Sequence, residues 1–219
     1  MSQFKYPDID TVTYNGQRWY SCEEGKAYPS ITTILGFTVP QEKKQRLEAW
    51  RTMLGPVVAD KKVKDACDRG TNVHLLLEQF LKGEELSTKG MNPESIQMFN
   101  SLKLRLKSIK QIYGQEMALY SDVLQVAGRC DLAGVWKTEE AIIDFKTASR
   151  SKDQHEILDY WLQLTFYALA HNEQYGTNIQ KGVIIMGVSE GIPLVFEKDL
   201  MEYVGPLVER IEKFYKSLT

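Results

Sequence analysis

The sequence has few cysteines and no long apolar run. Cys22, Cys67 and Cys130 are widely spaced and form no C-x-x-C motif, which argues against a disulfide framework and against a zinc knuckle. No stretch reaches the roughly 18 apolar residues of a membrane span, and acidic residues occur early, where a transit peptide would have few. We therefore expect a soluble, cytoplasmic protein without a membrane partner.

The chain also lacks a strong charge of either sign. Its 27 Lys and Arg residues nearly balance 29 Asp and Glu residues, so a nucleic-acid partner would require basic residues that are concentrated locally. It shows no internal repeat, low-complexity tract or linker. We predict a single domain over residues 1–219, with a hairpin and helical region at 1–115 and a sheet-containing catalytic core at 116–219.

The hydrophobic pattern predicts an α/β fold. Asn15 and Gly16 lie between two β-prone runs and predict a hairpin at residues 11–20. Helices are predicted at residues 30–35, 41–82 with a break at 55–56, 93–113, 156–172 and 200–218. Strands are predicted from residue 116 onward, including 131–136, 141–147, 182–187 and 194–197. We expect a small mixed β-sheet flanked by helices, with an N-terminal helical arch over the site.

The apolar strand at residues 141–147 ends in charged side chains. Alternation along a strand places Asp144 and Lys146 on one face. A short hairpin at residues 137–140 would pair this strand with residues 131–136, and Asp131 can then come opposite Asp144. Two close carboxylates repel each other unless a cation lies between them, so the pattern indicates a divalent-metal site. The alternative is a solvated ion pair at a strand end.

Two helical pairs of polar residues accompany this hairpin. His74 and Glu78 lie four residues apart beside an apolar stripe, where the imidazole could bind a metal and Glu78 could orient it or join it. Gln163 and Tyr167 share one face of a strongly apolar helix, and buried polar groups need partners. The alternatives are a hydrogen-bonded structural histidine and a core hydrogen bond within the second pair.

The motifs G-x-x-x-H, G-x-x-D, D-x-K and Q-x-x-x-Y occur here in the order of the RecB-type branch of the PD-(D/E)xK nuclease superfamily, which the chain resembles. Residues 28–35, 49–51 and 69–71 resemble phage exonucleases related to the mitochondrial genome maintenance exonuclease. The similarity covers roughly residues 15–190 and implies a restriction-endonuclease-like core. If the chain is phage-encoded, the resemblance implies that it acts in the host cytoplasm. Cys130 stands where the superfamily's name has proline. No cysteine follows it, so no iron–sulfur cluster is expected.

The resemblance also implies residue roles. The metal ligands would be His74, Asp131, Asp144 and the backbone carbonyl of Phe145. Lys146 would be the catalytic lysine, and Gln163 and Tyr167 would position it or hold the DNA backbone. Glu116 matches an acid often found before the hairpin, with a less defined role. Oxygen-rich ligation with one imidazole favours Mg²⁺ or Mn²⁺ over zinc.

Local positive charge suggests where DNA would bind. An acid-free stretch on the predicted helix at 93–113 carries Lys103, Arg105, Lys107 and Lys110, and the earlier helical region, which includes Arg69, has more basic than acidic residues. Either could line a phosphate channel or form a solvated basic face. Trp50 and Tyr113 could stack bases or belong to the core.

We predict a Mg²⁺- or Mn²⁺-dependent DNA exonuclease that acts on single strands or DNA ends in replication, repair or recombination, with a protein partner from one of these processes. One alternative is a structure-specific or junction endonuclease with the same chemistry. Another is a non-catalytic DNA-binding scaffold subunit. The set of His74, Asp131, Asp144 and Lys146 argues against the scaffold, because such a subunit does not need a buried acidic cluster.

Overall fold

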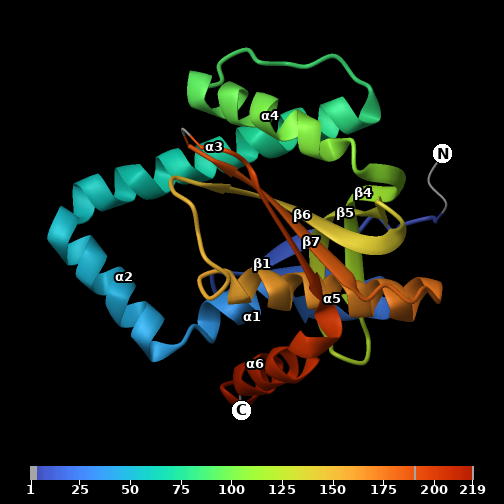
Figure 1. Cartoon of the computed structure of the whole chain (residues 1–219). Helices are drawn as coiled ribbons and strands as arrows, with labels where there is room; N and C mark the ends of the chain where they lie inside the picture. Colours follow the sequence, from blue (N-terminus) through green and yellow to red (C-terminus); the bar gives the residue numbers. More distant parts are fainter. Residues whose placement is uncertain (1–3, 190, 219) are drawn as a thin grey trace.

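A five-stranded mixed sheet occupies the centre of the computed structural model, which describes residues 4–189 and 191–218 (Figure 1). The strands lie in sequence order: β4 (Ile109–Ser121), β5 (Val126–Trp136), β6 (Glu139–Ala148), β7 (Lys181–Val188) and β8 (Leu194–Asp199). Strands β6 and β7 are parallel, and α5 (Leu158–Tyr175) connects them, while the other neighbours are antiparallel. The predicted mixed sheet flanked by helices is confirmed.

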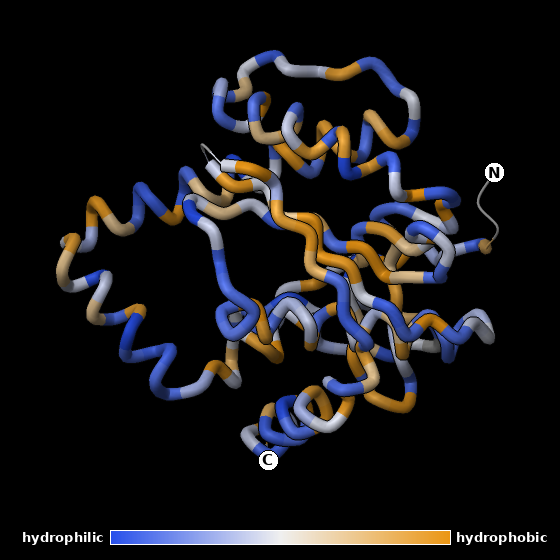
Figure 2. Tube along the Cα trace, in the orientation of Figure 1, coloured by the Kyte–Doolittle hydropathy of each residue, from blue (hydrophilic) through white to orange (hydrophobic). Residues whose placement is uncertain are grey.

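Helices cover both faces of this sheet. On one face, α3 (Pro56–Lys82) and α4 (Pro93–Leu106) pack on alternate strand residues that include Ile143 and Phe145. On the other face, α5 packs with α1 (Ile31–Phe37), the short 3₁₀ helix η2 (Leu200–Tyr203) and α6 (Val204–Lys216). Figure 2 shows the resulting concentration of hydrophobic residues along the central strands. Because the strand residues alternate, Asp144 points to the α5 face, between Ile143 and Phe145, which point to the α3 face.

A second, three-stranded antiparallel sheet precedes the arch. It consists of β1 (Thr11–Tyr14), β2 (Gln17–Ser21) and β3 (Ala27–Pro29), with the 3₁₀ helix η1 (Glu23–Gly25) between β2 and β3. Asn15 and Gly16 have φ values of 50° and 72°, the left-handed conformation that a tight hairpin turn requires, so the predicted hairpin is confirmed. An isolated β-bridge from Ser30 to Ala127 joins this sheet to β5.

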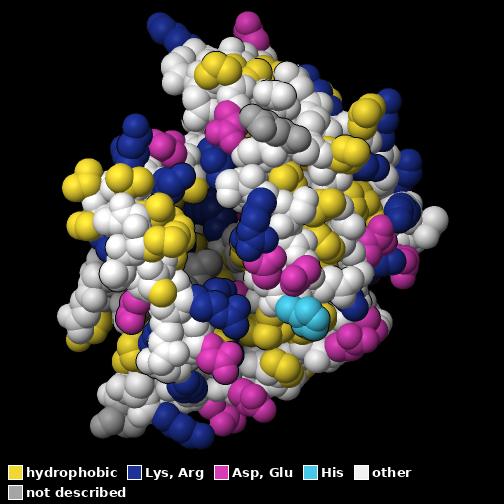
Figure 3. Space-filling model, turned by 60° about the vertical axis from the view of Figure 1, so that its left-hand side comes forward, with side chains coloured by type: hydrophobic (Ala, Val, Ile, Leu, Met, Phe, Trp, Pro, Cys, Tyr) yellow, Lys and Arg dark blue, Asp and Glu magenta, His cyan; other side chains and the backbone are white. Residues whose placement is uncertain are grey.

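Helix α2 (Gln41–Leu54) and the first half of α3 form the predicted helical arch, which projects away from the sheet (Figure 1). The two helices meet at Gly55, whose φ of 77° suits glycine. No side chain of helix α2 is fully buried, and Lys43 near its start forms an ion pair of 2.6 Å with Asp159 of α5. Figure 3 shows hydrophobic side chains on the outside of the arch and Lys and Arg side chains around the hollow beside it.

One predicted boundary is wrong. The helix expected at residues 93–113 ends at Leu106, and β4 begins at Ile109, seven residues before the predicted start of the sheet. Two register shifts in β4, at 109/111 and 112/114, insert extra residues into the strand. Ile109 and Ile112 therefore pack on the same cluster although they are three apart, a spacing that imitates a helix.

The last predicted helix is divided into η2 and α6. Among the helices of the described residues, none combines the length and hydrophobicity that crossing a membrane requires.

Candidate active site

A cleft of about 570 Å³ opens where α3, β4, β5, α5 and the start of α1 meet. The cleft is lined by Arg18, Tyr20, Ser30, Ile31, Thr32, Gly70, Thr71, His74, Leu75, Glu78, Glu116, Gly128, Arg129, Asp131, Gln163 and Tyr167. Six of the residues predicted for the site, His74, Glu78, Glu116, Asp131, Gln163 and Tyr167, are among them. The fold thus gathers side chains that are up to 93 positions apart in the sequence, from 74 to 167, at one place.

His74 of α3, Glu116 of β4 and Asp131 of β5 form a possible metal-binding cluster. One ligand atom from each lies within 4.8 Å of the others. His74 Nδ1 is 3.6 Å from Asp131 Oδ2 and 4.0 Å from Glu116 Oε1. On the other side of the ring, His74 Nε2 is 2.8 Å from the carbonyl oxygen of Phe145, which can only accept, so Nε2 carries a proton. This hydrogen bond turns Nδ1 toward the two acids.

Electrostatics in this cluster favour positive charge. Burial lowers the pKa of His74, but Asp131 and Glu116 outweigh it and raise this pKa to about 9. Glu116 also has a φ of 48°, unusual for a residue with a side chain. A left-handed backbone at a site residue is a form of strain that the surrounding fold maintains. The sequence did not reveal this backbone conformation, because Glu116 was predicted to begin a strand, where an extended backbone is expected.

Asp144 and Lys146 form a buried ion pair beside this cluster. Only 1% of the Asp144 side chain is exposed, and Lys146 Nζ donates to Asp144 Oδ1 at 2.9 Å. Burial raises the pKa of Asp144 to about 6, although Lys146 opposes this. Burial lowers the pKa of Lys146, but the charges of Asp144 and Asp131 outweigh it and raise this pKa. The raised pKa of Asp144 therefore comes mainly from burial, with the charge of Asp131 adding to it, whereas the raised pKa of Lys146 comes from the two carboxylates.

The hairpin of β5 and β6 has the predicted register. Leu132 pairs with Ile143, so continuing the ladder by one residue brings Asp131 opposite Asp144. At this end of the ladder Asp131 Oδ2 accepts a hydrogen bond of 2.8 Å from the backbone N–H of Phe145. The hairpin thereby fixes both aspartates and the Phe145 carbonyl relative to one another.

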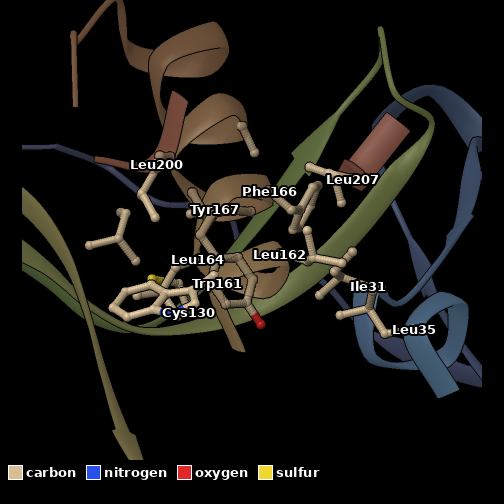
Figure 4. Packing of buried hydrophobic residues seen from close by; sticks show 14 of the residues in the cluster. Ile31, Leu35, Cys130, Trp161, Leu162, Leu164, Phe166, Tyr167, Leu200 and Leu207 are labelled. Carbon is tan, nitrogen blue, oxygen red and sulfur yellow. The ribbon is translucent and has the colours of Figure 1, made fainter. Parts of the chain in front are cut away.

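Gln163 and Tyr167 of α5 continue the network from Lys146. Lys146 Nζ donates to Gln163 Oε1 at 3.3 Å, and Gln163 Nε2 donates to the Tyr167 hydroxyl at 3.0 Å. Figure 4 shows Tyr167 among the apolar side chains of α5 and α1. A Cβ atom at Gly128 would lie 2.8 Å from the Tyr167 ring, so the glycine of G-x-x-D lets this ring approach β5.

The donor set fits a divalent cation. It offers carboxylate oxygens, a carbonyl oxygen and one imidazole nitrogen, which suits Mg²⁺ or Mn²⁺. Asp144 Oδ2 is buried and, among the described residues, receives no hydrogen bond, although Lys146 Nζ lies 2.8 Å away in a direction that does not make one. Because Lys146 already places a positive charge at this oxygen, the fit to a divalent cation rests on His74, Glu116 and Asp131, whose ligand atoms lie within 4.8 Å of one another. Glu78 lines the cleft but pairs with Lys82 at 2.5 Å, so it stays outside the cluster of acids.

The residues predicted to bind DNA lie elsewhere. None of Arg69, Lys103, Arg105, Lys107 and Lys110 is among the described residues that line the cleft. Lys103 Nζ lies 4.7 Å from the centre of the Phe99 ring, and Lys110 belongs to a strand instead of a helix. The Arg69 side chain is 10% exposed and forms an ion pair of 3.6 Å with Glu94.

The two aromatic residues considered for base stacking differ in exposure. Tyr113 is buried and donates to Glu140 at 2.7 Å, which is a core role, whereas Trp50 is half-buried on α2.

Sequence reasoning did not single out four residues of this region: three line the cleft, and one contacts Lys146. Arg18, Thr32 and Arg129 line the cleft. Tyr160 places its ring centre 5.0 Å from Lys146 Nζ, within the range of a cation–π contact. Arg129 lies inside the G-x-x-D motif and could have been noticed there. Arg18 and Thr32 gave no signal, because only the tertiary fold brings the N-terminal sheet to the cleft.

The chain matches the family model described as PD-(D/E)XK nuclease superfamily over residues 91–216, more than half of its length. It is 27% identical over 172 residues to mitochondrial genome maintenance exonuclease 1 of Mus musculus, covering 75% of this chain and 51% of that protein. The Homo sapiens protein of the same name is 24% identical over 173 residues, covering 75% and 50%. This chain therefore spans about half the length of these curated relatives.

Among solved structures, a presumed exonuclease from Eubacterium rectale aligns with 68% of this chain and 66% of its own, at 9% identity and a TM-score of 0.47.

The region that matches the family model contains Asp131, Asp144, Lys146 and Gln163, whereas His74 precedes it. The chain belongs to the PD-(D/E)XK nuclease superfamily.

Proposed function

We propose that this protein is a metal-dependent DNA exonuclease that acts on single strands or DNA ends. The observation that carries the proposal is the buried Asp144–Lys146 pair, which lies next to Asp131 and the His74–Glu116 edge of an open cleft. Similarity to relatives named as exonucleases supports the exonuclease assignment over other nuclease activities. Single-stranded DNA and a role in replication, repair or recombination, with a protein partner there, belong to the same proposal.

His74, Glu116, Asp131 and Asp144 would hold the metal ion together with the carbonyl of Phe145. A bound Mg²⁺ or Mn²⁺ supplies Lewis-acid polarisation of the phosphoryl group and lowers the pKa of water. The chain itself fixes the donors before binding, since β5 and β6 hold both aspartates and the Phe145 hydrogen bond sets the ring of His74. Rigid donors reduce the reorganisation that metal and substrate binding would otherwise require.

Lys146 would act on the reacting phosphate by hydrogen bonding and charge. An ammonium group has three N–H donors, and Asp144 and Gln163 accept two of them. The third donor is available to orient the attacking water or to stabilise the negative charge that develops on the phosphoryl oxygens. Tyr167 holds Gln163 and so limits the positions that the ammonium can adopt.

End-labelled linear DNA and circular DNA distinguish the candidate functions. Incubation with Mg²⁺ or Mn²⁺ should shorten linear single strands and leave circular single strands intact. Cut circles would replace the exonuclease by the junction or structure-specific endonuclease. Binding without any cleavage would leave the scaffold subunit. The Lys146→Ala and Asp144→Ala variants should lose cleavage, and either one degrading DNA at the wild-type rate would contradict the proposed chemistry.

A further inference from the structure

Two arginines on the wall of the cleft have no acidic partner among the described residues. Arg18 of β2 donates from Nη2 to the Thr32 hydroxyl at 3.0 Å. Arg129 of β5 donates from Nη1 to the backbone carbonyl of Glu116 at 2.7 Å. Both acceptors are neutral, so they orient the guanidinium groups without compensating their charge. Both side chains are exposed, and each retains further N–H donors.

Most arginines of this chain are arranged differently. Those that form an ion pair with a carboxylate are Arg46, Arg51, Arg69, Arg150 and Arg210. Apart from the two in the cleft, Arg105 on α4 is the other arginine without such a pair in the described part of the chain, and it is exposed to solvent. The two uncompensated positive charges in the cleft therefore contrast with the general pattern of this protein.

The fold holds Arg18 and Arg129 on rigid elements. Ser30, which is buried, hydrogen-bonds through Oγ to the Thr32 hydroxyl at 3.0 Å and so fixes the acceptor of Arg18. The bridge from Ser30 to Ala127 fastens this segment to β5, two residues before Arg129. The positions of both arginines thus follow from strand pairing and buried hydrogen bonds, which makes the wall a prearranged site.

We propose that Arg18, Thr32 and Arg129 form a subsite that binds a backbone phosphate of the DNA strand next to the phosphate that is cleaved. Guanidinium groups bind phosphate oxygens through paired N–H donors, and the Thr32 hydroxyl holds the guanidinium group of Arg18 in position. The subsite borders the metal-binding cluster, because Glu116 offers its carboxylate to the cluster and its carbonyl to Arg129. This inference rests on the proposed nuclease function.

Binding of a fluorescent single-stranded oligonucleotide, measured against salt concentration, tests the subsite. Ca²⁺ would replace Mg²⁺ in these titrations as an oxygen-liganded ion. Arg18→Gln should weaken binding about tenfold, because it removes charge-assisted hydrogen bonds to the phosphate. The slope of log K against log salt should fall by about 0.7 for the lost phosphate contact. With Mg²⁺, KM should rise about tenfold while kcat stays within about twofold, because the metal ligands and Lys146 are unchanged.

Lys213→Gln is the matched control. Lys213 is exposed on α6, and its substitution removes the same charge without touching the cleft. A second test variant, Arg129→Lys, keeps the charge but loses the planar fork, and it should weaken binding with a nearly unchanged salt slope. Calorimetric Mg²⁺ binding by this variant shows whether Glu116 has kept its place.

The outcomes separate this inference from the proposed function. If the wild-type protein cleaves DNA while Arg18→Gln matches the Lys213→Gln control in affinity, slope and KM, the subsite is wrong and the nuclease assignment stands. If the wild-type protein neither binds nor cleaves DNA, both are overturned. Loss of Mg²⁺ binding in Arg129→Lys would assign Arg129 to supporting Glu116, and the subsite would then depend on Arg18 alone.

Discussion

Replacing Lys146 by Met should destabilise the protein as well as inactivate it. Lys146 Nζ lies 2.8 and 2.9 Å from the two oxygens of Asp144, which is 1% exposed, so the substitution leaves a carboxylate buried without its cation. Removing one partner of a buried ion pair typically costs about 3–5 kcal/mol. In a protein of this size 1 kcal/mol corresponds to about 2–4 °C, so the melting temperature should fall by about 6–20 °C.

A double substitution separates the loss of the pair from the loss of packing. Asp144→Asn combined with Lys146→Met removes both charges and should recover most of the lost stability, while the double variant stays inactive. Thermal unfolding is followed by circular dichroism without added metal at pH 7. The deficit of Lys146→Met should shrink near pH 5, because a buried acid with a raised pKa is protonated there and then requires no cation. This reasoning would be refuted if Lys146→Met melted within about 2 °C of the wild type. It would also be refuted if the double variant were no more stable than Lys146→Met.

Three further predictions concern other parts of the molecule. Gly128→Ala places a Cβ atom 2.8 Å from the Tyr167 ring and should lower the free energy of unfolding by about 1–3 kcal/mol. The control Gly36→Ala, whose Cβ atom meets no atom within 4 Å, should not destabilise the protein. Equal melting temperatures for the two variants would contradict this account. His171 is fully buried, and burial lowers its pKa to about 4. As the pH falls, the imidazole is therefore protonated in the unfolded chain before it is protonated in the folded protein. The free energy of unfolding should be unaffected by this residue above about pH 6.5 and should decline by about 3 kcal/mol as the pH falls to 4. In His171→Gln this part of the urea-unfolding pH profile should flatten, and an unchanged profile would exclude the residue as its cause. Tyr160→Leu removes the ring 5.0 Å from Lys146 Nζ and should lower kcat between twofold and about thirtyfold, while Tyr160→Phe keeps the ring and most of the activity; a similar loss in both would assign the effect to the hydroxyl.

The parts of the fold that follow from local pattern were predictable. The β5–β6 hairpin, its register and the Gln163–Tyr167 pair on α5 depend on strand alternation and helical spacing, which operate over a few residues. The restriction-endonuclease-like core that the resemblance implied is present as the five-stranded sheet. The end of α4 was not predictable in this way, because the bulges of β4 give a strand the apolar spacing of a helix.

Which basic side chains line the cleft depends on tertiary packing, which the sequence pattern does not contain. Arg69 was assigned to a basic face, but α4 covers that side of α3 and supplies Glu94 as its partner. Arg18 reaches the cleft because the N-terminal sheet docks on β5, more than 100 residues later in the chain. Charge counting along a helix does not reveal which of its sides a later element will cover.

The arch has a consequence for how this protein would respond to proteases and to hydrogen exchange. Since no side chain of α2 is fully buried and the helix is joined to α3 through a glycine, little of the apolar surface that stabilises the core depends on it. Its backbone hydrogen bonds should open in local fluctuations far below the free energy of global unfolding. A protease could therefore cut near Gly55 while the sheet and its acidic cluster remain folded, and amides of α2 should exchange long before those of β6. Melting temperatures would then measure the unfolding of the sheet-containing core and would change little when the arch opens or is cut.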